Sequence, residues 1–251
     1  MRHSSPRFRA AVVALFAILA RAVAAAQALP DPKALMEKHN TAAGTRAALD
    51  KHTSIEMTAT MSMPAMGMEA SMEVLRGKPN KFVQKMVIGP VGEIITGFDG
   101  TVAWTTNPMM GAQLIQGDQL ASIKSNADFF SNMQDPANYS KAETVELTDF
   151  EGRKCYKVRL TREGRDGFEY FDAQTGLLAG FSGTVQSSQG PIETTTVFTE
   201  WGEVGGIKFP MKLEQRTPNG PATITFTKIE FDKVDPSAFN LPDAVKALVK
   251  P

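Results

Sequence analysis

The sequence contains one cysteine, Cys155, in 251 residues. A disulfide within the chain needs two cysteines, so this protein can form none, even in an oxidising compartment. Cys155 alternates with apolar residues in the strand-like segment "GRKCYKVRL". That pattern favours a buried packing role for the thiol over a nucleophilic one.

The sequence also lacks the common catalytic signatures. It has no H-E-x-x-H, G-x-S-x-G or C-x-x-C motif and no glycine-rich phosphate loop. Histidine is scarce: beyond the N-terminal segment only His39 and His52 are left, and we expect both at the surface or at helix ends. The carboxylates are scattered over turns and outward strand positions, which is typical of a solvated face. We therefore predict that the protein is not an enzyme, and we assign it no catalytic residue, metal ligand or cofactor.

Residues 1–28, "MRHSSPRFRAAVVALFAILARAVAAAQA", have the three parts of a secretory signal peptide. Arginines open the segment, an apolar run follows from Ala10 to Ala20, and small residues precede a cleavage position after Ala28 or Ala26. A membrane-spanning helix needs roughly 20 unbroken apolar residues, and Arg21 interrupts this run. We expect a periplasmic protein that is not integral to the membrane once processed.

Residues 29–251 carry no basic cluster. Without the four arginines of residues 1–28, 23 basic residues stand against 27 acidic ones, a net charge of about −4 before the histidines. A mildly acidic chain of this kind is unsuited to nucleic acid as a partner. No linker, internal repeat or low-complexity tract divides residues 29–251, so we predict a single domain with a sizeable core.

The first residues of this domain have the spacing of a helix. Asp31 followed by Pro32 predicts a helix start, and Gly44 predicts its end, with a second short helix directly after it. A further helix is expected from Asp118 to Gln134, where apolar residues recur at spacings of three and four. The segment "DAVKALV" predicts a short amphipathic piece at the C-terminus.

Alternation with a period of two dominates the rest of the chain from Ser54 onward. About ten short strands are separated by turn residues, with Asp99-Gly100 as a strong hairpin signal. So many strands with few helices predict an α+β, mostly β protein with a large, strongly curved antiparallel sheet. The helices are the available cover for its concave face.

The most unusual segment is "TMSMPAMGMEASME", residues 60–73, which is crowded with methionine. If Pro64-Ala65 forms the centre of a hairpin loop, Met63 lies opposite Met66 and Met61 opposite Met68. All the apolar residues of both strands then point to one face, and their polar neighbours point to the other face. The further pairs of this predicted register are Ala59 with Ala70, Met57 with Met72, and Ile55 with Val74.

Three interpretations of this apolar face compete. The methionines can fill a core, line a cavity for an acyl chain, or bind Cu(I), for which thioether sulfur is a suitably soft ligand. Copper is disfavoured because the row continues along both strands between alanines and valine, and because the hairpin has no histidine or cysteine. Methionine is flexible and adapts to ligands of variable shape, whereas leucine, isoleucine and valine specify a rigid core better.

Several segments together resemble the periplasmic LolA/LolB-like superfamily, in particular its outer-membrane lipoprotein-sorting-like members. They are a signal peptide followed by "LMEKHNTAAGTRAALDKHTSIEMTATMSMPAMGMEASMEVLRGKPNKF", "GFDGTVAW", "YFDAQTGLL" and "GGIKFPMKL". The resemblance implies an unclosed β-barrel of about 10–11 strands, with helices plugging a hydrophobic concavity that accepts acyl chains. The lipidated cysteine of the receptor branch is missing here, so a carrier fits better than an anchored acceptor.

We accordingly predict a carrier that binds a lipid or the acyl chains of a lipoprotein, with envelope proteins as further candidate partners. The alternatives are a periplasmic Cu(I)-binding protein that uses the methionine hairpin and a non-catalytic interaction domain with a filled core. The expected ligand-binding residues are Met57, Met61, Met63, Met66, Met68 and Met72 from the hairpin, with Met86 and Trp104 from neighbouring strands.

Overall fold

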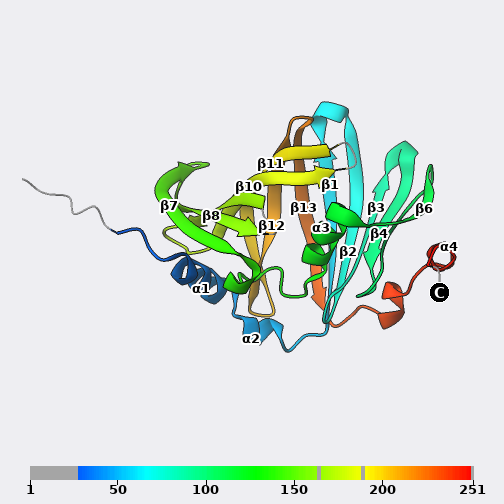
Figure 1. Cartoon of the computed structure of the whole chain (residues 1–251), viewed down its shortest axis with the longest axis horizontal. Coiled ribbons are helices and arrows are strands. Elements are labelled where there is room, and N and C mark those ends of the chain that lie inside the picture. The colour runs from blue at the N-terminus through cyan, green and yellow to red at the C-terminus, as the bar shows by residue number, and fades with distance from the viewer. Residues whose placement is uncertain (1–27, 163–164, 188–189, 250–251) are drawn as a thin grey trace, which may run out of the picture.

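A computed structural model of the chain describes residues 28–162, 165–187 and 190–249. Within these ranges the strands form a single sheet of 13 antiparallel strands, which curves strongly without closing (Figure 1). The predicted α+β, mostly β fold class is confirmed, with more strands than the 10–11 expected. The predicted signal peptide lies outside the described residues, apart from its last position.

The sheet follows the chain as a meander with one long-range pairing. Its order is β6-β5-β4-β3-β2-β1-β13-β12-β11-β10-β9-β8-β7, so the last strand returns to pair with the first. The strands are β1 (Ser54–Met63), β2 (Met68–Gly77), β3 (Lys81–Ile88), β4 (Gly92–Phe98), β5 (Ala103–Asn107), β6 (Gly111–Leu114), β7 (Lys141–Phe150), β8 (Arg153–Arg162), β9 (Arg165–Asp172), β10 (Leu178–Ser187), β11 (Gly190–Val204), β12 (Ile207–Thr217) and β13 (Gly220–Phe231).

The helices are short and few. They are α1 (Pro32–Ala43), α2 (Arg46–Leu49), α3 (Gly117–Ala127) and α4 (Asp243–Lys246), with single 3-10 turns at η1 (Pro64–Met66), η2 (Gly89–Val91), η3 (Pro136–Asn138) and η4 (Pro236–Phe239). The third helix ends at Ala127, seven residues before the predicted end, because Asp128 leaves the helical conformation and the chain continues in tight turns.

Local sequence signals account for most of these boundaries. The Asp31 carboxylate caps α1 by accepting a hydrogen bond from the Lys33 N–H, as predicted. Gly44 ends α1 with a left-handed conformation, φ 116°, which a residue without a Cβ adopts at little cost. The Asp99 carboxylate accepts from the two N–H groups of Thr101 and Val102, which fixes the β4–β5 turn.

The first three helices cover one face of the sheet, the concave face. Ala43 and Leu49 pack there with Ala127 against Ile55 and Phe98. A second cluster on the same face joins α1 to the strands β8 to β12, through Leu35 and Met36. The helices thus cover the concave face of the sheet.

The opposite face of strands β2 to β6 is covered by the C-terminal segment. Phe239 of η4 and Val245 of α4 are buried there. They pack against Leu75, Val83 and Trp104, which alternate with the inward-facing residues of their strands. In Figure 1 this segment lies on the far right of the molecule, outside the curve of the sheet.

Candidate functional site

The β1–β2 hairpin carries most of the predicted ligand-binding residues. Its loop has four residues, the 3-10 turn η1 followed by Gly67 with φ 60°, and not the two-residue centre predicted from Pro64-Ala65. Met63 therefore pairs with Met68, and Met61 pairs with Ala70. The predicted partners are wrong by two residues. A shift of two keeps every side chain on its own face, so the apolar face of the hairpin is as expected.

The methionines of this face fall into two groups by depth. Met57 and Met72 are 6% and 7% exposed and belong to the main core. Met61 and Met63, nearer the turn, are half-buried. Met66, in the turn itself, is 56% exposed. One apolar row thus runs from a sealed core to solvent.

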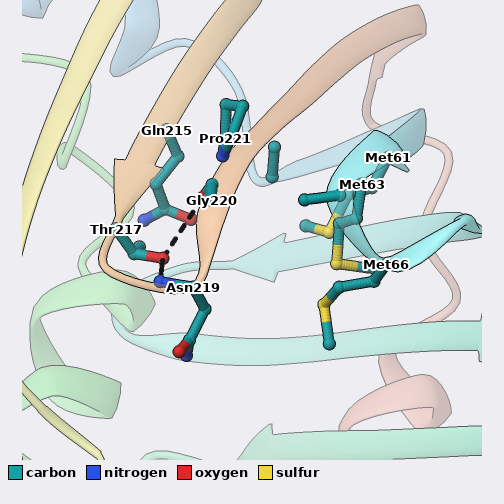
Figure 2. A pocket seen from close by; sticks show the side chains of 10 residues that line it. Met61, Met63, Met66, Gln215, Thr217, Asn219, Gly220 and Pro221 are labelled. Atoms are coloured by element: carbon teal, nitrogen blue, oxygen red, sulfur yellow. Dashed lines mark hydrogen bonds between the residues drawn. The ribbon is translucent and has the colours of Figure 1, made fainter.

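The exposed end of the row opens into a small pocket of about 200 Å³. Figure 2 shows Met61, Met63 and Met66 on one side of it and the β12–β13 hairpin on the other side. The pocket is smaller than the roughly 300–1,000 Å³ typical of a small-molecule site, so by itself it holds only part of a ligand. The lining residues are Met61, Met63, Ala65, Met66, Gln215, Thr217, Asn219, Gly220, Pro221 and Ala222.

The remaining predicted residues are divided between the two faces. Met68 is half-buried opposite Met63, and Met86 of β3 pairs with Met72 and packs, half-buried, against the main core. Trp104 pairs with Gly97 and is 1% exposed among the residues that the C-terminal segment covers. Trp104 therefore does not face the methionines, and its expected place in the ligand site is wrong.

Partly buried apolar side chains extend the methionine row along the concave face. They come from β3, from β13, where Ile224 pairs with Met61, and from α3, which contacts β3, β4 and β10. Each of these side chains is partly buried and packs against the main core. They are Met86, Ile224 and Phe226 of the sheet and Leu120 and Ile123 of α3.

A polar cluster, which the sequence reasoning missed, lies on the concave face around Glu169 of β9. The Glu169 carboxylate accepts hydrogen bonds from the Tyr139 hydroxyl and the Gln134 amide, both at 3.3 Å. Burial raises the pKa of Glu169 to about 7. The alternation of "FEYF" could have revealed it, because Glu169 shares the parity of the buried Phe171.

The same cluster fastens the segment after α3 to the first helix. Asn40 of α1 exchanges two hydrogen bonds of 2.7 Å with the backbone of Gln134. The Arg162 guanidinium donates to Ser125 of α3 at 2.7 Å and lies over the Tyr139 ring. The helical cover is therefore held by polar contacts at this side and by apolar contacts at the methionine side.

His39 is buried and not at the surface as predicted. It is 2% exposed, its Nδ1 accepts a hydrogen bond from the Leu178 N–H at 3.1 Å, and its Nε2 lies 3.4 Å from the Asn132 carbonyl oxygen. Burial lowers its pKa to about 4, so the ring is neutral at pH 7. Both ring nitrogens form structural contacts, so His39 connects α1 to β10 and to the segment near Asn132.

The other candidate reactive groups also have structural surroundings. Cys155 is buried, as predicted, and burial raises the pKa of its thiol to about 11, so little thiolate forms. Among residues 28–162, 165–187 and 190–249, no three His, Cys, Asp or Glu side chains lie close enough to hold a metal ion. None of the helices in those ranges is long and apolar enough to cross a membrane.

No family model matches the sequence, and no curated protein matches it. Solved structures do match its fold. A DUF1329 family protein from Desulfovibrio piger superposes with a TM-score of 0.58 at 14% identity, covering 84% of this chain and 98% of its own. A LolA superfamily protein from Nitrosomonas europaea gives a TM-score of 0.56 at 9% identity, covering 83% of this chain and 97% of its own.

A third solved structure is described as an outer-membrane lipoprotein-sorting protein domain, from Vibrio parahaemolyticus. It superposes with a TM-score of 0.54 at 11% identity and covers 82% of this chain and 97% of its own. The three likenesses extend over nearly the whole of each solved chain. They show that this chain has a LolA-like fold, in agreement with the resemblance of its sequence segments.

Proposed function

We propose that this protein is an exported carrier that binds an acyl chain along the methionine row of its concave face. The observation that carries the proposal is the change in depth along that row, from the buried Met57 and Met72 to the accessible Met61, Met63 and Met66. A filled core would be sealed at both ends. An apolar row that starts in a core and opens into a pocket suits a ligand with a long apolar part.

The energetics of such a site are favourable. Each methylene group that leaves water contributes about 0.8 kcal/mol, so several carbons of an acyl chain in the pocket already give measurable binding. Methionine has three rotatable bonds and a polarizable sulfur, which lets the walls adapt to chains of different shape. Beyond the pocket, Met86, Ile224 and Phe226 add further half-buried apolar surface next to the main core.

The proposal includes the compartment and the partners. Residues 1–28 would direct export and be removed near Ala28, which leaves residues 29–251 as one carrier domain in the periplasm. The ligand would be a lipid or the acyl part of a lipoprotein, and envelope proteins would supply or receive it. The LolA-like fold of the chain supports this direction at the level of the fold.

The decisive experiment compares glutamate substitutions at the two depths of the row. Native mass spectrometry would record the lipids that co-purify with residues 29–251 and that bind when added. Met61→Glu/Met63→Glu should lose the lipid and stay folded, because both side chains already reach solvent. Met72→Glu should unfold the protein, because it buries a carboxylate in the core. A wild-type protein that neither carries nor takes up any lipid would refute the carrier function.

Leucine substitutions at the same positions separate the carrier from the copper alternative. Met61→Leu/Met63→Leu/Met66→Leu keeps the apolar surface and removes every thioether of the pocket. An acyl site should tolerate this change, with at most a severalfold loss of affinity. A Cu(I) site should lose its metal, because leucine has no donor atom. A protein that binds neither lipid nor Cu(I) would support the interaction domain with a filled core.

A further inference from the structure

Four hairpin turns lie together at one end of the sheet. In an antiparallel meander every second turn returns to the same end, which places the β1–β2, β3–β4, β5–β6 and β12–β13 turns at the same end as the β8–β9 and β10–β11 connections. Figure 1 shows the first, second and fourth of them along the upper side of the molecule. We call these four turns, residues 63–67, 89–92, 107–111 and 217–220, the rim.

The rim is free of charge. Its four turns read "MPAMG", "GPVG", "NPMMG" and "TPNG", each with a proline followed by a glycine two or three residues later and none with Asp, Glu, Lys or Arg. Four of the five other described turns between strands carry a charged residue in or next to the turn, namely Lys78, Asp99, Glu151 and Asp172; the fifth, Gly205-Gly206, carries none. The absence of charge is therefore a shared feature of the four rim turns and not of one whole end of the sheet, since the β8–β9 connection is flanked by Arg162 and Arg165.

The rim also exposes large apolar side chains. Met109 and Met110 in the β5–β6 turn are 82% and 62% exposed, and Met66 in the β1–β2 turn is 56% exposed. Val87, at the end of β3, is 44% exposed next to the β3–β4 turn. Single exposed apolar residues are ordinary, but a cluster of them on uncharged turns marks an interaction surface.

The turns touch one another and the pocket. A Cβ on Gly92 would lie 3.2 Å from the Pro108 ring, so the β3–β4 and β5–β6 turns are in contact. A Cβ on Gly220 would lie 2.9 Å from the Ala65 Cβ, which joins the β12–β13 turn to the β1–β2 turn. Ala65 and Gly220 also line the methionine pocket. Two of the four rim turns, β1–β2 and β12–β13, therefore border the pocket mouth.

We propose that the rim docks onto the surface of a lipid bilayer and inserts Met66, Met109 and Met110 shallowly among the headgroups. This inference rests on the proposed carrier function and adds the partner at which loading or release takes place. A pocket mouth held against a bilayer would let an acyl chain pass between membrane and pocket without entering water. Exposure of the chain to water is the largest energetic cost of such a transfer. Turns with no charged group to dehydrate enter the interface more readily than charged ones.

Charges near the rim indicate which lipids it suits. Glu69 and Glu93 flank the β1–β2 and β3–β4 turns and are exposed. Arg216 of β12, directly before the β12–β13 turn, forms ion pairs with Glu151 and Glu214. The surroundings of the rim are thus mildly acidic, so anionic lipids should not strengthen docking. Apolar insertion into neutral lipid is the binding mode that fits.

Vesicle flotation tests the proposal directly. Residues 29–251, which contain all the described helices and strands, would be mixed with neutral vesicles of phosphatidylcholine and phosphatidylethanolamine, and with vesicles that also contain phosphatidylglycerol. The protein should float with both and remain bound at high salt, since screening weakens only charge-based binding. Met109→Glu/Met110→Glu should lower the vesicle-bound fraction at least about tenfold.

A matched control keeps the test specific. Leu147 lies on the edge strand β7 and is 51% exposed, so Leu147→Glu makes the same chemical change away from the rim and should bind vesicles like the wild type. The proposal is overturned if the wild type stays unbound, if only anionic vesicles bind it and salt releases it, if the rim variant binds unchanged, or if only an envelope protein retains it.

Lipid binding in solution distinguishes failure of the docking from failure of the carrier function. The rim variant should still take up added lipid by native mass spectrometry, because Met109 and Met110 do not line the pocket. Met61→Glu/Met63→Glu should float with vesicles and carry no lipid. Flotation of a wild-type protein that never holds lipid would leave the docking in place and refute the carrier.

Discussion

Two buried groups that hold the same segment should give the protein opposite responses to pH. His39 contacts the carbonyl of Asn132, and Glu169 accepts from the side chain of Gln134, so both fasten the segment that follows α3. We predict that His39→Gln and Glu169→Gln change the pH dependence of unfolding in opposite directions. Glutamine is close in size to both residues and does not titrate, so each variant removes one titration with little change in packing.

The sign follows from the direction of each pKa shift. Burial lowers the pKa of His39 from 6.5 to about 4, so the unfolded state binds more protons than the folded state between these values. Its contribution to stability is therefore lost as the pH falls through that window. Burial raises the pKa of Glu169 from 4.5 to about 7. Here the folded state binds more protons, and its contribution grows as the pH falls from 7 towards 4.5.

The two effects are similar in size. Between about pH 7.5 and about pH 5, each shift changes the free energy of unfolding by about 2 kcal/mol, with opposite signs. They nearly cancel in the wild type. His39→Gln keeps only the Glu169 effect. Relative to the wild-type profile, its free energy of unfolding should therefore rise by about 2 kcal/mol at the lower pH. Glu169→Gln should lose about the same amount.

Urea denaturation at the two pH values, followed by far-UV circular dichroism, measures this difference. The comparison uses the change between pH values within each variant, so a constant loss of packing in either variant cancels. The double variant His39→Gln/Glu169→Gln should return to the wild-type profile. The reasoning is refuted if both single variants follow the wild-type profile, because the two groups would then titrate alike in the folded and unfolded states.

Two further predictions concern stability. Met57→Ala should lower the free energy of unfolding by about 2–5 kcal/mol, because it leaves a cavity in the core. Met66→Ala should change it by less than about 0.5 kcal/mol. Equal effects of the two substitutions in thermal denaturation would contradict the change of depth along the row. Gly97→Ala should destabilise the protein by about 1–3 kcal/mol, because the new Cβ would meet the Trp104 ring. Gly89→Ala, with no atom within 4 Å of its Cβ, is the control, and a neutral Gly97 variant would show that Trp104 can move aside.

The local signals in the sequence predicted the elements well. The cap at Asp31, the helix end at Gly44 and the turn at Asp99-Gly100 each depend on residues within a few positions of one another. The period-two pattern also assigned the hairpin methionines to one face, since parity survives a shift of two residues. The short edge strand β6 was missed, because four residues cannot establish an alternation.

Burial was harder to predict, because the sequence does not say what covers a face. His39 has the neighbours of a surface histidine, and only the packing of α1 against β10 and the segment near Asn132 buries it. In the sequence, the alternation of "TVAWTTN" puts Trp104 on a face with Val102, but either face of that segment could have been the inner one. The C-terminal segment, more than 130 residues later in the chain, covers the face that carries Trp104 and so makes it the outer face.

The sequence by itself determined the strands, the turns and the apolar face of the β1–β2 hairpin, because these follow from neighbouring side chains and backbone preferences. Only the tertiary structure decided that Met57 and Met72 are sealed beneath the helices while Met61, Met63 and Met66 reach solvent. That division depends on where the helices and the β12–β13 hairpin lie over the row. It arises from contacts between segments far apart in the chain, which no local pattern encodes.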